Sequence, residues 1–383
     1  MLHRAAASQE CTAPIAHYAR LHNTWRERRR LIFLCSASAP MGAFLHSVEA
    51  AFNAALLLER ALILDGCKDT HAAAELQRAY SGFFEGRGLD WSASGLGDAA
   101  ASGRSIFLPA TKRLPSGTAQ FNRTHAMGEH VGSAAVHLHV DEHSHIVARY
   151  DLSWHCLLHA LLAPRPALLA LVPSNLRDGP YSALHVRLGD GNMNKPGAVH
   201  AQSTWLVGKP PLAWHWLNES RPLESGFSRS APSGLLRCFA TALPAPHVVI
   251  SDTEAVLAAA ERLGMHTTRA LGVPINLGMA GVDHTAGDVR KLFADWWLLA
   301  NAHAAASVGY KNTHHGVPYS SQFIWTARRW HDEGEPIPPY RLACERSHHD
   351  GQRKQQHEAK RFGVIFDPAV TRTLTCSTGC APQ

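Results

Sequence analysis

The order of short apolar runs near the start of the chain constrains its fold most. Leu31–Cys35 is apolar and predicts a buried strand. Ala43–Glu59 carries apolar residues at helical spacing, and ALILD, which ends at Asp65, predicts a second strand. The apolar face of the helix consists of Phe44, Val48, Phe52, Ala55 and Leu56. A strand, a helix and a strand in this order predict a βαβ unit, and therefore an α/β fold.

The length of the chain predicts two domains. It has 383 residues, which is more than one hydrophobic core usually organises. Hydrophobic residues make up 45% and charged residues 18%, the balance of a globular protein. We expect domains at 29–175 and 180–345, separated by a linker at Val172–Gly179 that is rich in Pro, Asn and Gly. Residues 1–28 are interpreted as a tail or short helix, and 346–383 as a C-terminal extension.

The net charge of +6 fits an anionic small substrate as well as a nucleic acid. The densest basic cluster is RERRR at Arg26–Arg30, and no zinc-finger or RNA-binding spacing occurs, so we expect no nucleic-acid partner. The uncharged segment Leu31–Val48 contains Ser, Pro, Gly and His, which suit a bilayer core poorly. No membrane anchor is therefore evident in this chain.

The eight cysteines include no CxxC pair, which argues against a structural zinc site. Cys344, Cys376 and Cys380 are candidates for disulfides if the chain is secretory. The Asn-x-Ser/Thr triplets at Asn122 and Asn218 favour a lumenal location.

Tyr181–Val186 is apolar and β-prone, and the chain then turns at Asp190, which lies between two glycines. His185 and Arg187 are two residues apart, so on a strand they project from the same face. Ligands of open α/β sheets bind at the carboxyl ends of strands. A guanidinium at that position suits a pair of phosphate oxygens, and its alternative partner is the Asp190 carboxylate.

The segment HVRLGD, which runs from His185 to Asp190, resembles the HxRxGD signature of the GDP-fucose-dependent fucosyltransferase superfamily. This superfamily includes the α1,6-, α1,2- and protein O-fucosyltransferases. The family pattern usually continues with Lys, whereas Gly191 follows here. ERALIL at Glu59–Leu64 is similar to the strand that follows the first helix of these enzymes.

The resemblance implies a GT-B-like α/β architecture, with two Rossmann-like domains facing a cleft. The domain at 29–175 would be on the acceptor side, and the domain at 180–345 would bind the GDP-sugar donor. The implied enzyme is an inverting glycosyltransferase of the Golgi or endoplasmic reticulum lumen. It moves L-fucose from GDP-fucose to a glycan or protein hydroxyl, and its partners are the nucleotide sugar and a glycan or glycoprotein acceptor. Arg187 would stabilise the leaving diphosphate without a metal ion or other cofactor.

The resemblance also implies donor-binding residues. His185 would orient the nucleotide or hold phosphate. Asp252 follows the predicted strand His247–Ile250, where the family carries Ser/Thr-Asp-Asp; an N-cap role is its alternative. Asp295 lies in the predicted helix Val289–His303 and would accept hydrogen bonds from guanine; a solvated helix carboxylate is its alternative. The remaining donor-binding candidates are Asp190, Ser320, Ser321 and Gln322. Ser307 is the alternative to the serines of the Ser320–Gln322 triplet.

The loop APMGAFLH differs from the family's Gly-rich loop, and no carboxylate occurs between Cys35 and Val48. His46 is the nearest titratable group, so it is our candidate for the catalytic base; an ordinary packing histidine is its alternative. The altered loop and the missing carboxylate also favour a second hypothesis, a non-catalytic homologue that binds a GDP-sugar or glycan.

A third hypothesis comes from the His-rich segment Gly128–Ile146. His137 and His139 share one strand face, and His143 and His145 follow a predicted turn. Histidines beside carboxylates can bind metal, which would support a metal-dependent hydrolase. The alternative is an ordinary His-rich hairpin in a chain with 26 histidines.

Overall fold

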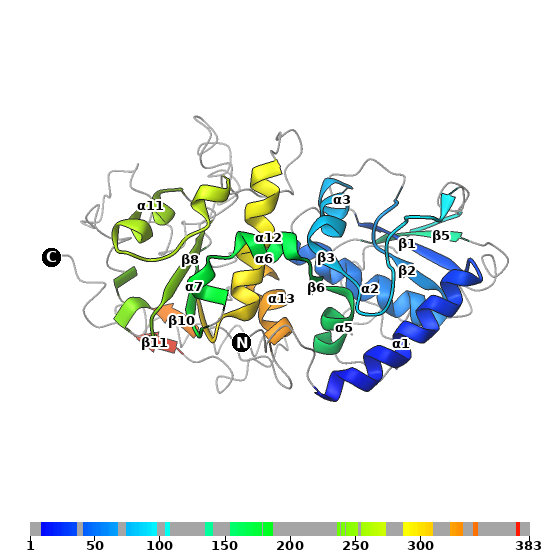
Figure 1. Ribbon diagram of the computed structural model, residues 1–383, viewed down its shortest axis with the longest axis horizontal. Helices are drawn as coiled ribbons and strands as arrows, with labels where there is room; N and C mark the ends of the chain where they lie inside the picture. Colours follow the sequence, from blue (N-terminus) through cyan, green and yellow to red (C-terminus); the bar gives the residue numbers. More distant parts are fainter. Residues whose placement is uncertain are drawn as a thin grey trace, which may run out of the picture. The chain divides into compact units, whose positions relative to one another are not determined.

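The computed structural model divides the chain into two compact units, which are described separately (Figure 1). Unit 1 comprises Met1–Leu171 and Leu277–His284, and unit 2 comprises Val172–Asn276 and Thr285–Gln383. The residues that the structure describes are 9–36, 41–67, 74–97, 104–107, 135–140, 154–177, 179–186, 236–237, 239–241, 243–251, 254–272, 286–308, 322–331, 340–343 and 373–375.

Unit 1 is built on a parallel sheet of four strands in the order β2-β1-β5-β4. The strands are β1 (Leu31–Ser36), β2 (Ala61–Ile63), β4 (Arg104–Phe107) and β5 (Ala135–Val140). Helix α2 (Met41–Leu58) connects β1 to β2 and packs against both of them, which confirms the predicted βαβ unit. The chain order changes direction between β1 and β5, so the topological switch point of this sheet lies there.

The N-terminal segment is a helix rather than a tail. Helix α1 (Gln9–Glu27) packs against β2 and against α5 (Trp154–Leu161), and a disulfide joins Cys11 to Cys156. Buried residues recur along α1 at helical spacing: Cys11, Ile15, Tyr18, His22 and Trp25. Of the two interpretations of residues 1–28, tail or short helix, the helix is the one that the structure describes, and its buried face makes it part of the core of unit 1.

An aromatic cluster in unit 1 surrounds α3 (Ala74–Phe83). The ring of Tyr80 lies 5.0 Å from that of Phe44 and 5.3 Å from that of Phe84, measured between centroids. The Trp91 indole is buried beside them and donates a hydrogen bond of 2.9 Å to the carbonyl of Leu161. The small elements here are α6 (Pro166–Leu171) and the antiparallel pair β3 (Phe84–Glu85) and β6 (Ala163–Pro164).

The part of the His-rich segment that the structure describes, β5, is not an arm of a hairpin. β5 is buried along its whole length, and both of its neighbours, β1 and β4, run parallel to it. An arm of a hairpin would instead pair with an antiparallel neighbour. His137 and His139 are therefore core residues of a parallel sheet, while His143 and His145 lie outside the described residues.

Unit 2 contains a parallel sheet of five strands in the order β11-β10-β9-β7-β8. The predicted strands are present as β7 (Ser182–Val186), β8 (His247–Ser251) and β9 (Ala304–Val308). The sheet also contains β10 (Tyr340–Ala343) and β11 (Thr373–Thr375). Because β11 pairs with β10, the segment interpreted as an extension contributes a strand to this sheet.

The described helices of unit 2 include α7 (Ser174–Arg177), α11 (Glu254–Arg262), α12 (Ala286–Asn301) and α13 (Gln322–His331). A short 3₁₀ turn, η3, covers Arg269–Leu271.

Helix α12 confirms the predicted helix at 289–303, with a start three residues earlier, and packs against α13. The Trp330 ring of α13 packs edge-on against those of Trp296 and Trp297, at centroid distances of 6.0 and 5.4 Å. In the described part of the chain, no helix combines the length and apolarity needed to cross a bilayer.

His22 makes the stability of unit 1 sensitive to acid. The side chain is completely buried, and its Nε2 lies 2.9 Å from the carbonyl oxygen of Leu62. Burial is the largest influence on the pKa of His22 and lowers it below 6.5; the Leu62 carbonyl, Asn23 and Asp90 oppose this effect, and Arg26 adds to it. The unfolded chain therefore takes up the proton first, so the contribution of His22 to stability is complete above pH 6.5 and declines as the pH falls.

We expect His22→Gln to lose less stability than the wild type when the pH falls from about 7.5 to about 5.5, by up to about 1.4 kcal/mol per pH unit. The measurement is the free energy of unfolding in urea across this range. His17→Gln is the matched control, because His17 is exposed on the same helix. Identical pH slopes for wild type and His22→Gln would contradict the prediction.

Candidate functional site

The candidate site lies at the carboxyl end of β7, the strand from which the sheet of unit 2 extends in both directions. The chain passes from β7 to β8 on one side, and β9 then pairs with β7 on the other, so the switch point lies between β7 and β9. His185 is opposite Ser307 of β9 in the parallel register, and opposite Ile250 of β8. The structure thus places His185 where an open α/β sheet binds its ligands.

The His185 side chain is buried, with 7% of its surface exposed. Its ring lies against Phe323 of α13, with the two centroids 5.7 Å apart and the ring planes inclined by 30°. Gln322, a predicted donor-binding residue, is the first residue of α13, directly before Phe323. The structure therefore brings the start of α13 to the predicted His185, a contact that no sequence pattern indicated.

Several predicted site residues fall outside the described part of the chain: Arg187, Asp190, Asp252, Ser320 and Ser321. Two of them directly follow described strands that end in register. Val186 is the last residue of β7 and precedes Arg187, and it pairs with Ser251, which precedes Asp252. The roles of all five residues stay predictions.

Asp295 is buried on α12, with 6% of its surface exposed, so it is not the solvated helix carboxylate of the alternative interpretation. Its Oδ1 accepts a hydrogen bond from the hydroxyl of Thr268, and its Oδ2 forms an ion pair with Nζ of Lys291. Both partners are buried as well. Burial raises the pKa of Asp295, while Lys291 and then Thr268 lower it in part by favouring the charged form.

His46, the candidate base, lies in unit 1 on the second turn of α2 and is partly exposed. Its Nδ1 is 3.8 Å from a carboxylate oxygen of Glu49, one turn further along the helix. Glu49 directly follows Val48, so it lies one residue beyond the segment that is free of carboxylates. The i,i+3 spacing of the two residues was the signal that could have identified the pair.

The structure describes two histidines of the predicted cluster, His137 and His139, both on β5. His137 stacks on Phe33 of β1, with centroids 4.9 Å apart, and its Nδ1 is 3.8 Å from Sγ of Cys35. Cys35 forms a disulfide with Cys67. His139 is buried further along β5, opposite Cys35 in the strand register.

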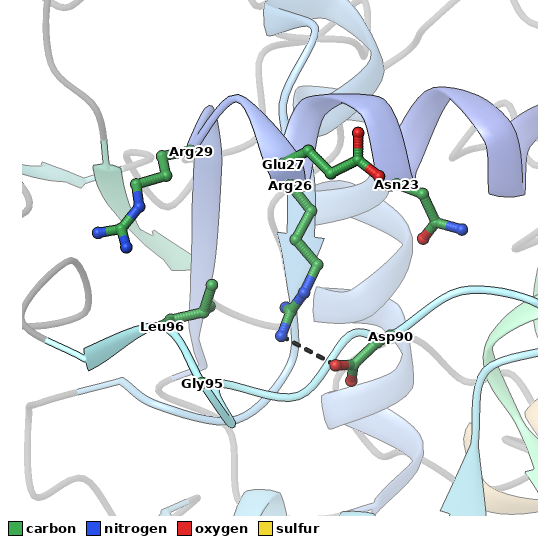
Figure 2. Close-up of a pocket in the computed structure, with 7 residues that line it drawn as sticks. All are labelled: Asn23, Arg26, Glu27, Arg29, Asp90, Gly95 and Leu96. Carbon is green, nitrogen blue, oxygen red and sulfur yellow. Dashed lines mark ion pairs between the residues drawn. The ribbon is translucent and has the colours of Figure 1, made fainter.

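A surface groove of about 430 Å³ in unit 1 is lined by residues other than the site residues predicted from the sequence. Figure 2 shows Arg26 reaching from α1 toward Asp90, with which it forms an ion pair of 2.9 Å, while Arg29 points away from this pair. Arg26 also donates hydrogen bonds to the carbonyls of Ser92 and Ser94. Its guanidinium therefore ties the 90–96 segment to α1. The groove is lined by Asn23, Arg26, Glu27, Arg29, Asp90, Gly95 and Leu96.

The described residues thus form two mixed α/β units, each with a parallel sheet. The sequence matches no protein-family model, and no curated protein is significantly similar to it. Among solved structures, it is similar to NodZ α-1,6-fucosyltransferase soaked with GDP-fucose, at 14% identity and a TM-score of 0.39, over 79% of this chain and 92% of that one. The same enzyme co-crystallised with GDP gives 14% and 0.40, over 78% and 92%. NodZ from Bradyrhizobium gives 14% and 0.40, over 78% and 93%.

Proposed function

We propose that the chain is an inverting, fucosyltransferase-like glycosyltransferase that moves L-fucose from GDP-fucose to a hydroxyl of a glycan or glycoprotein. The observation that carries this proposal is the position of His185 at the switch point of a parallel sheet, beside the first turn of α13. The sequence HVRLGD then adds a guanidinium and a carboxylate directly after that strand. Under this proposal the two units form a GT-B-like enzyme with the donor site in unit 2.

The chemistry requires neutralisation of the leaving group. The acceptor oxygen attacks the anomeric carbon of fucose, the bond from that carbon to the GDP oxygen breaks, and the configuration inverts. Negative charge grows on the β-phosphate as this bond lengthens. Arg187 stabilises that charge with a bidentate guanidinium, which a metal ion would otherwise do, so the reaction proceeds without a metal.

The other residues bind the nucleotide. The His185 ring, held by Phe323, orients the diphosphate. The backbone N–H groups at the start of α13 suit phosphate or ribose oxygens. Ser320 and Ser321, which directly precede α13 in the sequence, and Gln322, its first residue, are proposed to bond the same oxygens. Asp190 and Asp252 complete the predicted set of donor-binding residues.

Asp295 reads the guanine in this proposal. Its carboxylate has about four lone-pair positions, and Thr268 and Lys291 use two of them. The free positions can accept hydrogen bonds from the N1–H and N2–H groups of guanine. The ion pair with Lys291 favours the charged form of the carboxylate, which accepts stronger hydrogen bonds than the neutral form.

His46 accepts the proton of the acceptor hydroxyl in this mechanism. The Glu49 carboxylate lies 3.8 Å from Nδ1 of the imidazole, so Nε2 is the nitrogen proposed as the base. The disulfides Cys11–Cys156 and Cys35–Cys67 support a location in the lumen of the Golgi or endoplasmic reticulum, where disulfides persist.

The metal-dependent hydrolase has no support from the described residues. The only grouping of three potential ligand residues found among them is His137 with Cys35 and Cys67, and both of its sulfurs are used in a disulfide. The non-catalytic binder stays as the second candidate, because it needs the same donor site without turnover.

Ligand-dependent thermal stability tests the donor site. We expect GDP and GDP-fucose at about 100-fold their dissociation constants to stabilise the chain by about 2.7 kcal/mol, which raises its melting temperature by about 2–4 °C. UDP-sugars should have no such effect, and GDP-mannose tests selection of the sugar. Equal stabilisation by UDP-sugars would contradict a guanine site. Stabilisation by GDP-fucose without release of GDP in the presence of glycan acceptors would select the non-catalytic binder.

A further inference from the structure

Three potential metal ligands meet at the carboxyl edge of the sheet of unit 1. Cys35 is near the end of β1, Cys67 follows β2, and His137 is on β5, so the three residues come from neighbouring strands. Phe33 pairs with His137 in the register, and Cys35 is two residues beyond Phe33, so the side chains of Cys35 and His137 lie on the same face of the sheet. This is the switch point between β1 and β5, the expected place for a ligand.

The distances suit a single metal ion. Sγ of Cys35 is 3.8 Å from Nδ1 of His137, and the three ligand atoms all lie within 4.8 Å of one another. Zinc–sulfur bonds of about 2.3 Å and zinc–nitrogen bonds of about 2.0–2.1 Å at tetrahedral angles give a sulfur–nitrogen separation of about 3.6 Å. The sulfur–nitrogen spacing is therefore nearly in place, and the main rearrangement needed is separation of the two bonded sulfurs.

We propose that reduction of the Cys35–Cys67 disulfide converts this cluster into a binding site for Zn²⁺ or a similar thiophilic divalent ion. A dithiol supplies two electrons and two protons, and it becomes a disulfide while the two cysteines become thiols. Each thiol then releases its proton as its sulfur binds the metal. The oxidised form binds no metal at this site, because sulfur in a disulfide is not a thiolate ligand.

The surroundings favour the metal-bound form once the disulfide is open. Two thiolates and one Zn²⁺ have no net charge, so the complex is less costly to bury than unpaired thiolates. Cys35 is 1% and His137 4% exposed, and the ring of Phe33 holds the imidazole in position. Three protein ligands leave a fourth coordination position for solvent. This inference is independent of the proposed transferase activity.

Cobalt binding tests the site in the full-length chain. The protein is reduced with a dithiol, desalted under nitrogen and titrated with Co²⁺. We expect a thiolate-to-cobalt charge-transfer band that saturates at one equivalent and is absent from the unreduced protein. Zn²⁺ should abolish the band by displacement and should raise the melting temperature of the reduced protein only.

Substitutions of the three proposed ligands test whether they bind the cobalt ion that gives this charge-transfer band. Cys35→Ser should abolish it, and Cys67→Ser provides the same test at a less buried position. His137→Phe keeps a ring on Phe33 but removes the nitrogen ligand, so Co²⁺ affinity should fall at least about tenfold. The matched control is the double variant Cys11→Ser/Cys156→Ser, which removes the other described disulfide and should keep the band.

Three results would overturn the proposal. The first is a band of unchanged affinity in His137→Phe or in both serine variants. The second is a reduced, folded wild-type protein without the band. The third is a chain that unfolds on reduction, by near-ultraviolet circular dichroism, and does not refold when Zn²⁺ is added.

Discussion

Arg187→Ala is expected to reduce the turnover of GDP-fucose by about 10²–10³-fold, which corresponds to about 2.7–4 kcal/mol of lost transition-state stabilisation. The guanidinium follows directly on β7, the strand at the switch point of unit 2, and in the proposed mechanism it neutralises the departing diphosphate. Because the charge on that diphosphate is greatest in the transition state, kcat should fall more than the donor KM rises. The measurement is steady-state release of GDP with a mixture of glycan acceptors.

Two further variants test whether turnover depends on the planar guanidinium at residue 187 or on positive charge in general. Arg187→Lys keeps a positive charge but loses the planar fork, so its turnover should lie between those of wild type and Arg187→Ala. Arg262→Ala is the matched control, because Arg262 is exposed on α11 of the same unit, and its turnover should equal that of the wild type. Turnover of Arg187→Ala close to the wild-type value would remove the central step of the proposed mechanism.

Lys291→Met is expected to destabilise unit 2 by about 3–5 kcal/mol at neutral pH. Lys291 and Asp295 are 1% and 6% exposed and form an ion pair one helical turn apart on α12. Methionine fills most of the volume of lysine but leaves the Asp295 carboxylate buried without a countercharge. The measurement is urea unfolding followed by tryptophan fluorescence, which reports on α12 and α13 through Trp296, Trp297 and Trp330.

The pH dependence of this variant has a defined sign. Burial already raises the pKa of Asp295 above its ordinary value of 3.8, and loss of Lys291 removes a charge that lowers it. A raised pKa means that the folded state holds the proton more tightly than the unfolded state does. The loss of folding stability caused by the buried carboxylate is therefore absent below pH 3.8 and grows as the pH rises through the folded-state pKa. Lys291→Met should therefore be destabilised less at about pH 5 than at about pH 7.5.

The double variant Lys291→Met/Asp295→Leu is the control for this prediction. Replacing both charges with apolar groups removes the uncompensated carboxylate, so most of the lost stability should return. A destabilisation of Lys291→Met below about 1 kcal/mol, or one independent of pH, would show that the pair does not stabilise the unit as a buried ion pair.

The strands and helices that the sequence predicted are those with a continuous apolar pattern. β1, α2 and β7 fall at the predicted positions because their buried residues are mostly Leu, Ile, Val, Ala and Phe. α1 was predicted only as an alternative to a tail, because its buried face includes the polar His22 and few of the aliphatic residues that mark a helical period. β10 and β11 were missed because they are short strands of mixed polarity, stabilised by pairing that is distant in sequence.

The candidate site was predictable only where local sequence determines it. His185 was identified from the strand and the glycines that follow it, and Lys291 is recognisable as the i−4 partner of Asp295. Thr268 is 27 residues before Asp295 and reaches it only through tertiary packing. The disulfide pairings could not be predicted either, because spacing alone does not select one pairing among eight cysteines.

The link between Cys11 and Cys156 encloses most of unit 1 in a covalent ring, because its two ends are 145 positions apart in the sequence. β1, α2, β2 and β5 all lie inside this ring. A single cut by a protease anywhere between the two cysteines leaves both pieces joined. On a non-reducing gel the nicked chain would migrate as one species, and its fragments would separate only after treatment with a thiol.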